Sequence, residues 1–244
     1  FTQVKTAVCE PVNMEMVFNA SVTDIYRNEY LSPRSPYTTL QLPKQGIGEW
    51  CHPTLTADID DSGMRAQVRS GLLSTSLGVP FRTPAEGKNI AFTSLWDNYP
   101  DSLTIPLTGK ASHAYLLLAG STNHMQCHIA NGVIRVHYAD DTSETLELIN
   151  PDNWCPIEQD FYVDGIAFCL QTPRPYRLHF KSGLVSNNLE KDLNITGVYG
   201  RPIDGGAGVL LDMLLDPAKE LKSLTLETLS NDVVIGIMGI TLQK

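Results

Sequence analysis

The feature that most constrains the fold is a short run in the middle of the chain, residues 113–119 (HAYLLLA), in which almost every residue is apolar. The run is too short for an independent helix and a glycine follows it, which is typical of a central β-strand covered on both faces. The 15 prolines and 18 glycines of the 244 residues favour many short strands joined by turns. We therefore predict an all-β chain, a β-sandwich with this strand in its middle.

Alternating patterns predict further strands. In residues 132–138, Ile134, Val136 and Tyr138 point one way and the polar residues between them point the other way, so this run is a half-buried strand. Asp140 and Asp141 then turn the chain, and the apolar positions that resume after them predict a hairpin. Other expected elements are a hairpin within residues 1–30, strands at 176–180, 209–215, 224–229 and 233–242, and one helical turn at 218–221.

Residues 70–90 are rich in Gly, Ser, Thr and Pro, and this composition predicts a boundary between two parts of the chain. We expect an N-terminal β segment, residues 1–88, that packs on or completes a main sandwich formed by residues 89–244. A single domain spanning 1–244 is the alternative, because all-β sandwiches often reach this length.

The overall charge argues against nucleic acid as a partner. The formal net charge is −9, whereas binding to a phosphate backbone needs clustered Lys and Arg. No run of 18 apolar residues predicts a membrane span. Phe1 begins the sequence without an initiator Met, so we expect a processed product or a fragment of a longer protein. The five cysteines show no CxxC pair, and we expect most of them to be small buried residues within strands.

Several stretches partly match catalytic or metal-binding motifs, but none is complete, so the sequence predicts no catalytic residue, metal or cofactor. Residues 58–63 match the start of a calcium loop, but Arg69 stands where that loop needs a glutamate. His124, Cys127 and His128 would lie too far apart along a strand to share one ion. The GxSxG motif of serine hydrolases is absent.

Two proline-containing loops combine aromatic and acidic residues and predict a carbohydrate-binding site. An aromatic face can stack on a sugar ring while carboxylates bind its hydroxyl groups. The candidates are Trp96 and Asp97 in one loop and Trp154 and Asp160 in the other. The alternative for each tryptophan is a core position, which is the commoner place for a tryptophan in a sandwich. The alternative is a glycoside hydrolase. Such enzymes need two carboxyl groups about 5–9.5 Å apart, and the two loops contain five candidates: Asp97, Asp101, Asp152, Glu158 and Asp160.

Four stretches together resemble one bacterial family: residues 30–53 (YLSPRSPYTTLQLPKQGIGEWCHP), 89–126 (from NIAFTSLWDNYP to STNHMQ), 150–165 (NPDNWCPIEQDFYVDG) and 221–242 (LKSLTLETLSNDVVIGIMGITL). They are similar to the C-terminal β-sandwich of large bacterial proteins in which an α-helical toroid, like that of glycoside hydrolases, comes first. That family is described mainly as a domain of unknown function. The resemblance implies an antiparallel jelly roll like the galactose-binding domain, with very little helix.

The resemblance also implies an accessory role. We expect a non-catalytic module of a bacterial polysaccharide-processing protein, periplasmic, on the cell surface or secreted. Its partner would be a carbohydrate or a neighbouring catalytic domain of the same polypeptide. In such proteins the catalytic acid and base are expected on the helical toroid, so no catalytic residue is carried over to this chain.

Overall fold

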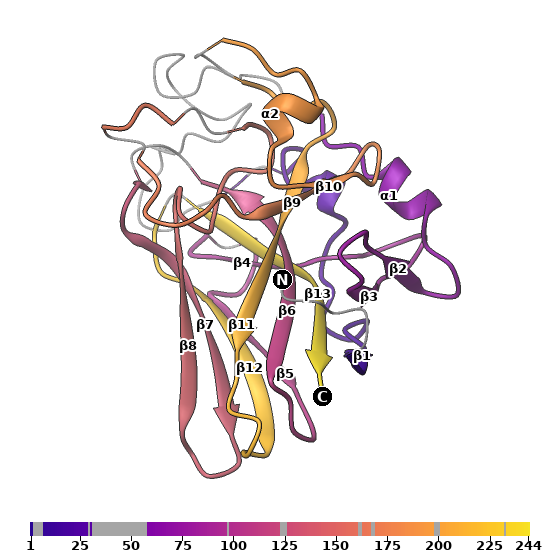
Figure 1. Ribbon diagram of the computed structural model, residues 1–244, viewed down its shortest axis with the longest axis vertical. Helices are drawn as coiled ribbons and strands as arrows, with labels where there is room; N and C mark the ends of the chain where they lie inside the picture. Colours follow the sequence, from indigo (N-terminus) through magenta and orange to yellow (C-terminus); the bar gives the residue numbers. More distant parts are fainter. Residues whose placement is uncertain are drawn as a thin grey trace.

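The computed structural model describes residues 1, 7–28, 30, 58–96, 98–122, 126–160, 163–166, 169–197, 201–231 and 233–244. Within them the chain is all-β, as predicted, and its only α-helices are the short α1 (Ser62–Ala66) and α2 (Leu189–Asp192). Most strands belong to two antiparallel sheets that face each other (Figure 1). The prediction of an all-β sandwich with very little helix is therefore confirmed.

The larger sheet has seven strands and the smaller sheet has four. The larger one has the order β1-β13-β6-β11-β9-β10, with β4 also paired to β13, and the smaller one has the order β5-β12-β7-β8. A separate hairpin joins β2 (Leu72–Ser74) and β3 (Pro80–Arg82). The bounds of the sheet strands are β1 Cys9–Pro11, β4 Ala91–Ser94, β5 Ser102–Pro106, β6 His113–Ser121, β7 Ala130–Tyr138, β8 Ser143–Ile149, β9 Tyr176–His179, β10 Val185–Ser186, β11 Ala207–Leu214, β12 Leu221–Thr228 and β13 Val234–Gln243.

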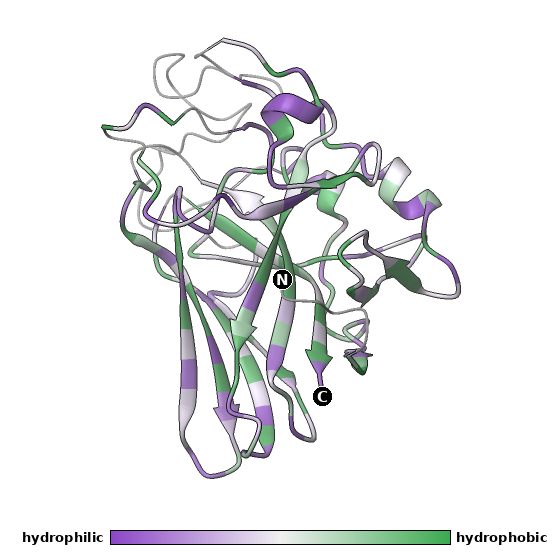
Figure 2. Ribbon diagram, in the orientation of Figure 1, coloured by the Kyte–Doolittle hydropathy of each residue, from purple (hydrophilic) through white to green (hydrophobic). Residues whose placement is uncertain are grey.

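The main hydrophobic core lies between the two sheets. Alternate residues of β6, among them Leu116 and Leu118, meet the inward residues of β7 and β12, such as Ile134 and Leu226. Because side chains alternate across a strand, the outer face of the smaller sheet is polar. Figure 2 shows this alternation along β8 and β12, whereas β6 and β13 are hydrophobic over much of their length.

A second core covers the other face of the seven-stranded sheet. Tyr115 and Leu117 of β6 point into it, where they join Tyr26, Met64 and other residues from the N-terminal part of the chain. Figure 1 shows α1, β2 and β3 on the side of this sheet that faces away from β7 and β8. All of β6 except its first residue is therefore buried, which explains the nearly continuous apolar run of residues 113–119.

Some local predictions were wrong. The strand near the N-terminus, β1, pairs with β13 instead of forming a hairpin, and residues 22–24 form a 3₁₀ turn. Residues 217–218 form a turn, in which the Asp216 carboxylate accepts a hydrogen bond from the Ala218 amide, and not a helix. Among the described cysteines only Cys155 is buried, and none forms a disulfide; Cys51 lies outside the described residues.

Two predictions about the organisation of the chain stay predictions: the division into two parts near residue 88 and the jelly-roll connectivity of the strands. No helix in the described part of the chain is long and apolar enough to cross a bilayer.

Candidate functional site

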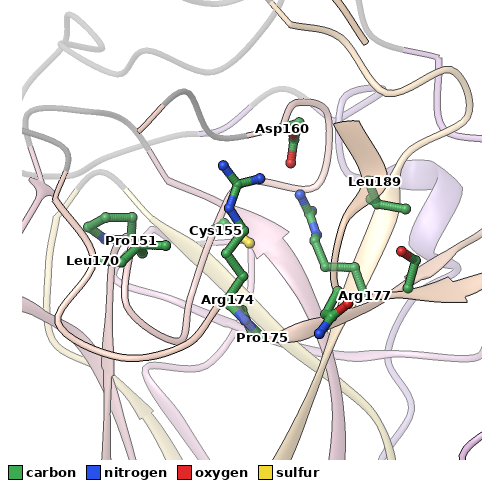
Figure 3. Close-up of a pocket in the computed structure, with 10 residues that line it drawn as sticks. Pro151, Cys155, Asp160, Leu170, Arg174, Pro175, Arg177 and Leu189 are labelled. Carbon is green, nitrogen blue, oxygen red and sulfur yellow. The ribbon is translucent and has the colours of Figure 1, made fainter. Parts of the chain in front are cut away.

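A hollow lies at the end of the sandwich, lined by residues of β9, β10 and α2 and of the loop that follows β8 (Figure 3). Its volume is about 370 Å³, including the solvent at its mouth. Half of its wall is apolar, supplied by Pro151, Cys155, Leu170, Pro175 and Leu189. We call it the Arg174 pocket; its polar lining residues are Asp160, Arg174, Arg177, Ser186 and Asn187.

Arg174 is the polar residue with the most unused hydrogen-bonding capacity. It lies between two prolines, which hold the backbone extended as it enters β9. Its side chain is 32% exposed, and it makes no hydrogen bond within the described part of the chain. The carboxylate of Glu190, in α2, lies 3.7 Å away, beyond hydrogen-bonding distance. Arg174 is therefore positioned to bind a ligand.

Arg177 forms the buried floor of the pocket. Its guanidinium donates hydrogen bonds to the carbonyl oxygens of Pro156 (2.8 Å), Gln159 (3.0 Å) and Ala207 (3.0 Å). It has no ion pair with any described carboxylate, although its side chain is 4% exposed. In Figure 3 its guanidinium and that of Arg174 extend toward the same part of the pocket as the carboxylate of Asp160.

Asp160 is the only carboxylate among the described residues that line the pocket. Its Oδ2 accepts a hydrogen bond from Nη2 of Arg201 at 2.9 Å, and both side chains are buried. The same Nη2 lies 3.4 Å from Glu190. Oδ1 of Asp160 accepts no hydrogen bond from any described residue. Arg201 thus neutralises Asp160, while one oxygen stays able to accept a hydrogen bond from a ligand.

The structure does not bring the predicted site residues together. Trp154 belongs to the core between the sheets, where it is 0% exposed. Trp96 is 5% exposed and belongs to the second core, on the opposite face of the seven-stranded sheet. Its indole Nε1 donates a hydrogen bond to the Asn231 carbonyl at 2.7 Å. Neither indole offers a face to a sugar in this conformation, and Asp97 lies outside the described residues.

The remaining carboxylates of the second loop are occupied by structural contacts. Asp152 accepts a hydrogen bond from the backbone amide of Gln171 at 3.0 Å. Glu158 is 1% exposed and accepts a hydrogen bond from the Tyr26 hydroxyl at 2.5 Å. Burial raises the pKa of Glu158 to about 7, although this hydrogen bond and the charge of Arg177 act in the opposite direction. Glu158 does not reach the pocket, so it is not placed to act on a ligand there.

Sequence reasoning found one residue of the pocket, Asp160, and missed the arginines. Arg174 and Arg177 follow the loop in the segment PRPYR, for which the sequence predicts only a strand at 176–180. The signal that can reveal such a residue is an arginine between prolines, since the prolines hold its backbone extended where the chain enters the strand.

No protein-family model matches the sequence, and a search of curated proteins finds no match.

Proposed function

We propose that this chain is a non-catalytic β-sandwich that binds carbohydrate in the Arg174 pocket. As the sequence resemblance implies, it would serve as an accessory module of a bacterial polysaccharide-processing protein outside the cytoplasm. The observation that carries the proposal is the free hydrogen-bonding capacity of Arg174 beside a wall of which half the lining residues are apolar.

The chemistry of the pocket suits a sugar. A sugar hydroxyl both donates and accepts hydrogen bonds, and here Arg174 supplies donors while Oδ1 of Asp160 is an acceptor. Asn187 is exposed, makes no hydrogen bond to a described residue, and supplies both. Pro151, Leu170 and the other apolar residues of the wall can cover the C–H face of a ring. Loops at one end of a rigid sandwich are a usual place for such a site.

The hydrolase alternative has less support. Glycoside cleavage needs two carboxyl groups that face the same bond. The described residues of the lining supply one, Asp160, which is paired with Arg201. A purely bracing role, in which the chain supports a catalytic domain, is the second candidate. The burial of Trp96 and Trp154 favours it, because those side chains then need no ligand.

The proposal is tested by affinity electrophoresis of the chain through gels that contain plant, host or microbial polysaccharides. Arg174→Ala removes the free donors without breaking a hydrogen bond within the described part of the chain, so it should leave the fold intact. Arg135→Ala is the matched control, because Arg135 is 38% exposed and pairs with Glu227 on the smaller sheet, away from the pocket.

We expect one polysaccharide to slow the migration of the wild type and of the control Arg135→Ala through the gel, but not the migration of Arg174→Ala. Retardation that Arg174→Ala retains would place binding elsewhere on the molecule. If no polysaccharide retards the wild type, the bracing role becomes the better proposal. Release of new sugar ends during incubation would instead support the hydrolase alternative.

A further inference from the structure

We infer that the sugar bound in the Arg174 pocket carries an acidic group, either the carboxylate of a uronic acid or a sulfate ester. This inference rests on the proposed carbohydrate-binding function and names the class of sugar. It is argued from the charges of the pocket, their partners and the wall that surrounds them.

The first argument is the state of Arg174. A guanidinium presents its N–H donors as a planar fork, which matches a carboxylate or a sulfate in two parallel hydrogen bonds. In this structure Arg174 makes only a long ion pair, in which its Nη2 lies 3.7 Å from the Glu190 carboxylate, and Glu190 is itself 47% exposed. A ligand anion can therefore form the close pair that Glu190 does not form.

The second argument is the charge balance of the wall. Among the described residues, Arg174 and Arg177 line the pocket and Arg201 lies beside it, while the nearby negative charges are those of Asp160, 2.9 Å from Arg201, and of Glu190, 3.4 Å from Arg201 and 3.7 Å from Arg174. The three arginines outnumber the two carboxylates. Charges in a shielded hollow interact more strongly than charges in bulk water. The chain as a whole carries a net charge of −9, so it has no general attraction for anions. A cationic pocket on such a chain favours a specific acidic ligand.

The third argument separates an acidic sugar from an inorganic anion. Half of the lining residues are apolar, and a sulfate or phosphate ion makes no use of them. Asn187 and Oδ1 of Asp160 can bind the hydroxyl groups spread around a sugar ring, whereas a sulfate ion has no hydroxyl group. The combination fits a ring that has an acidic group at one edge and hydroxyl groups at another.

The test compares polymers that differ only in the acidic group. A uronic acid polysaccharide is paired with its carboxyl-reduced form, and a sulfated polysaccharide is paired with its desulfated form. Binding is measured by affinity electrophoresis and by titration calorimetry at about 50 and 200 mM salt. We expect the chain to bind one acidic polymer and to lose the interaction when the acidic group is removed. The pair that shows this difference identifies the group as carboxylate or sulfate.

Three variants assign the effect to the pocket. Arg174→Ala should weaken binding about tenfold to a hundredfold, since a hydrogen-bonded charge pair is lost. Arg174→Lys keeps the charge without the fork and should bind with intermediate strength. Glu190→Gln removes the carboxylate that competes for Arg174 and should bind more tightly than the wild type. Equal melting temperatures would show that all three variants are folded.

Other outcomes overturn the inference. Equal binding of an acidic polymer and its neutral form, lost in Arg174→Ala, would support the carbohydrate function but refute the acidic sugar. Binding of acidic polymers that Arg174→Ala retains would show an interaction outside the pocket and would also refute it. If no polymer of any kind binds, the proposed function fails and the inference fails with it.

Discussion

The buried carboxyl group of Glu158 leads to the sharpest prediction about stability. Its pKa in the folded chain is about 7, against an ordinary value of 4.5. Between these two values the folded chain holds a proton that the unfolded chain has lost. Stability therefore falls as the pH rises from 4.5 to 7 and is then constant with respect to this group. At about 1.4 kcal/mol for each pH unit, the loss is about 3 kcal/mol.

Glu158→Gln should remove this loss, because the amide has nearly the same shape and carries no charge at any pH. The assay is urea unfolding of the wild type and the variant at pH 5, 6, 7 and 8. We expect the free energy of unfolding of the variant, relative to that of the wild type, to rise by about 2.5 kcal/mol between pH 5 and pH 8. The contributions of the other titrating groups cancel in the difference.

Glu147→Gln is the control, since it makes the same change at an exposed position of β8. Its difference from the wild type should change little with pH, because an exposed carboxylate stays hydrated in both states. A difference between Glu158→Gln and the wild type that is the same at pH 5 and pH 8 would refute the reasoning. It would mean that Glu158 is not held protonated by burial.

The remaining predictions concern packing and thiol reactivity. Gly120→Ala should cost several kcal/mol or prevent folding, because its Cβ would lie 1.9 Å from the Val234 carbonyl oxygen. In Gly87→Ala the Cβ would meet no atom within 4 Å, so this variant should lose only about 1–2 kcal/mol, for its positive φ. Comparable losses in the free energy of unfolding of the two variants, measured in urea, would contradict this reasoning. Burial raises the pKa of the Cys127 thiol to about 11, so its alkylation in the native chain should still accelerate between pH 8 and pH 10; a rate already constant above pH 8 would argue against it.

Local pattern predicted much of the sandwich. The alternation in residues 132–138 identified β7, and its hairpin with β8 followed from the short turn between them. The apolar run at 113–119 identified the central strand, because burial of both faces leaves no polar position. The pairing of β1 with β13 joins Cys9 to Gln243. Nothing in the two local sequences encodes a contact over that separation, so the expected N-terminal hairpin was the natural but wrong alternative.

The site was harder to predict because its residues look ordinary in sequence. The loops that contain Trp96 and Trp154 have the aromatic and acidic residues expected of a sugar-binding surface. They nevertheless fold so that the two indoles are buried in separate cores. Aromatic character alone does not distinguish a platform from a core residue. Arg174 becomes distinctive only in space, where α2 and the loop after β8 meet beside it and supply it with no hydrogen bond.

Arg177, the floor of the pocket, donates hydrogen bonds to four backbone carbonyl groups, which fix it to the surrounding chain. They belong to the loop after β8, through Pro156 and Gln159, and to the start of β11, through Ala207 and Gly208. The floor is thus cross-linked before any ligand arrives, and its shape is preorganised. Binding then loses little conformational entropy on the protein side, so even a single sugar unit can gain measurable affinity from a few contacts.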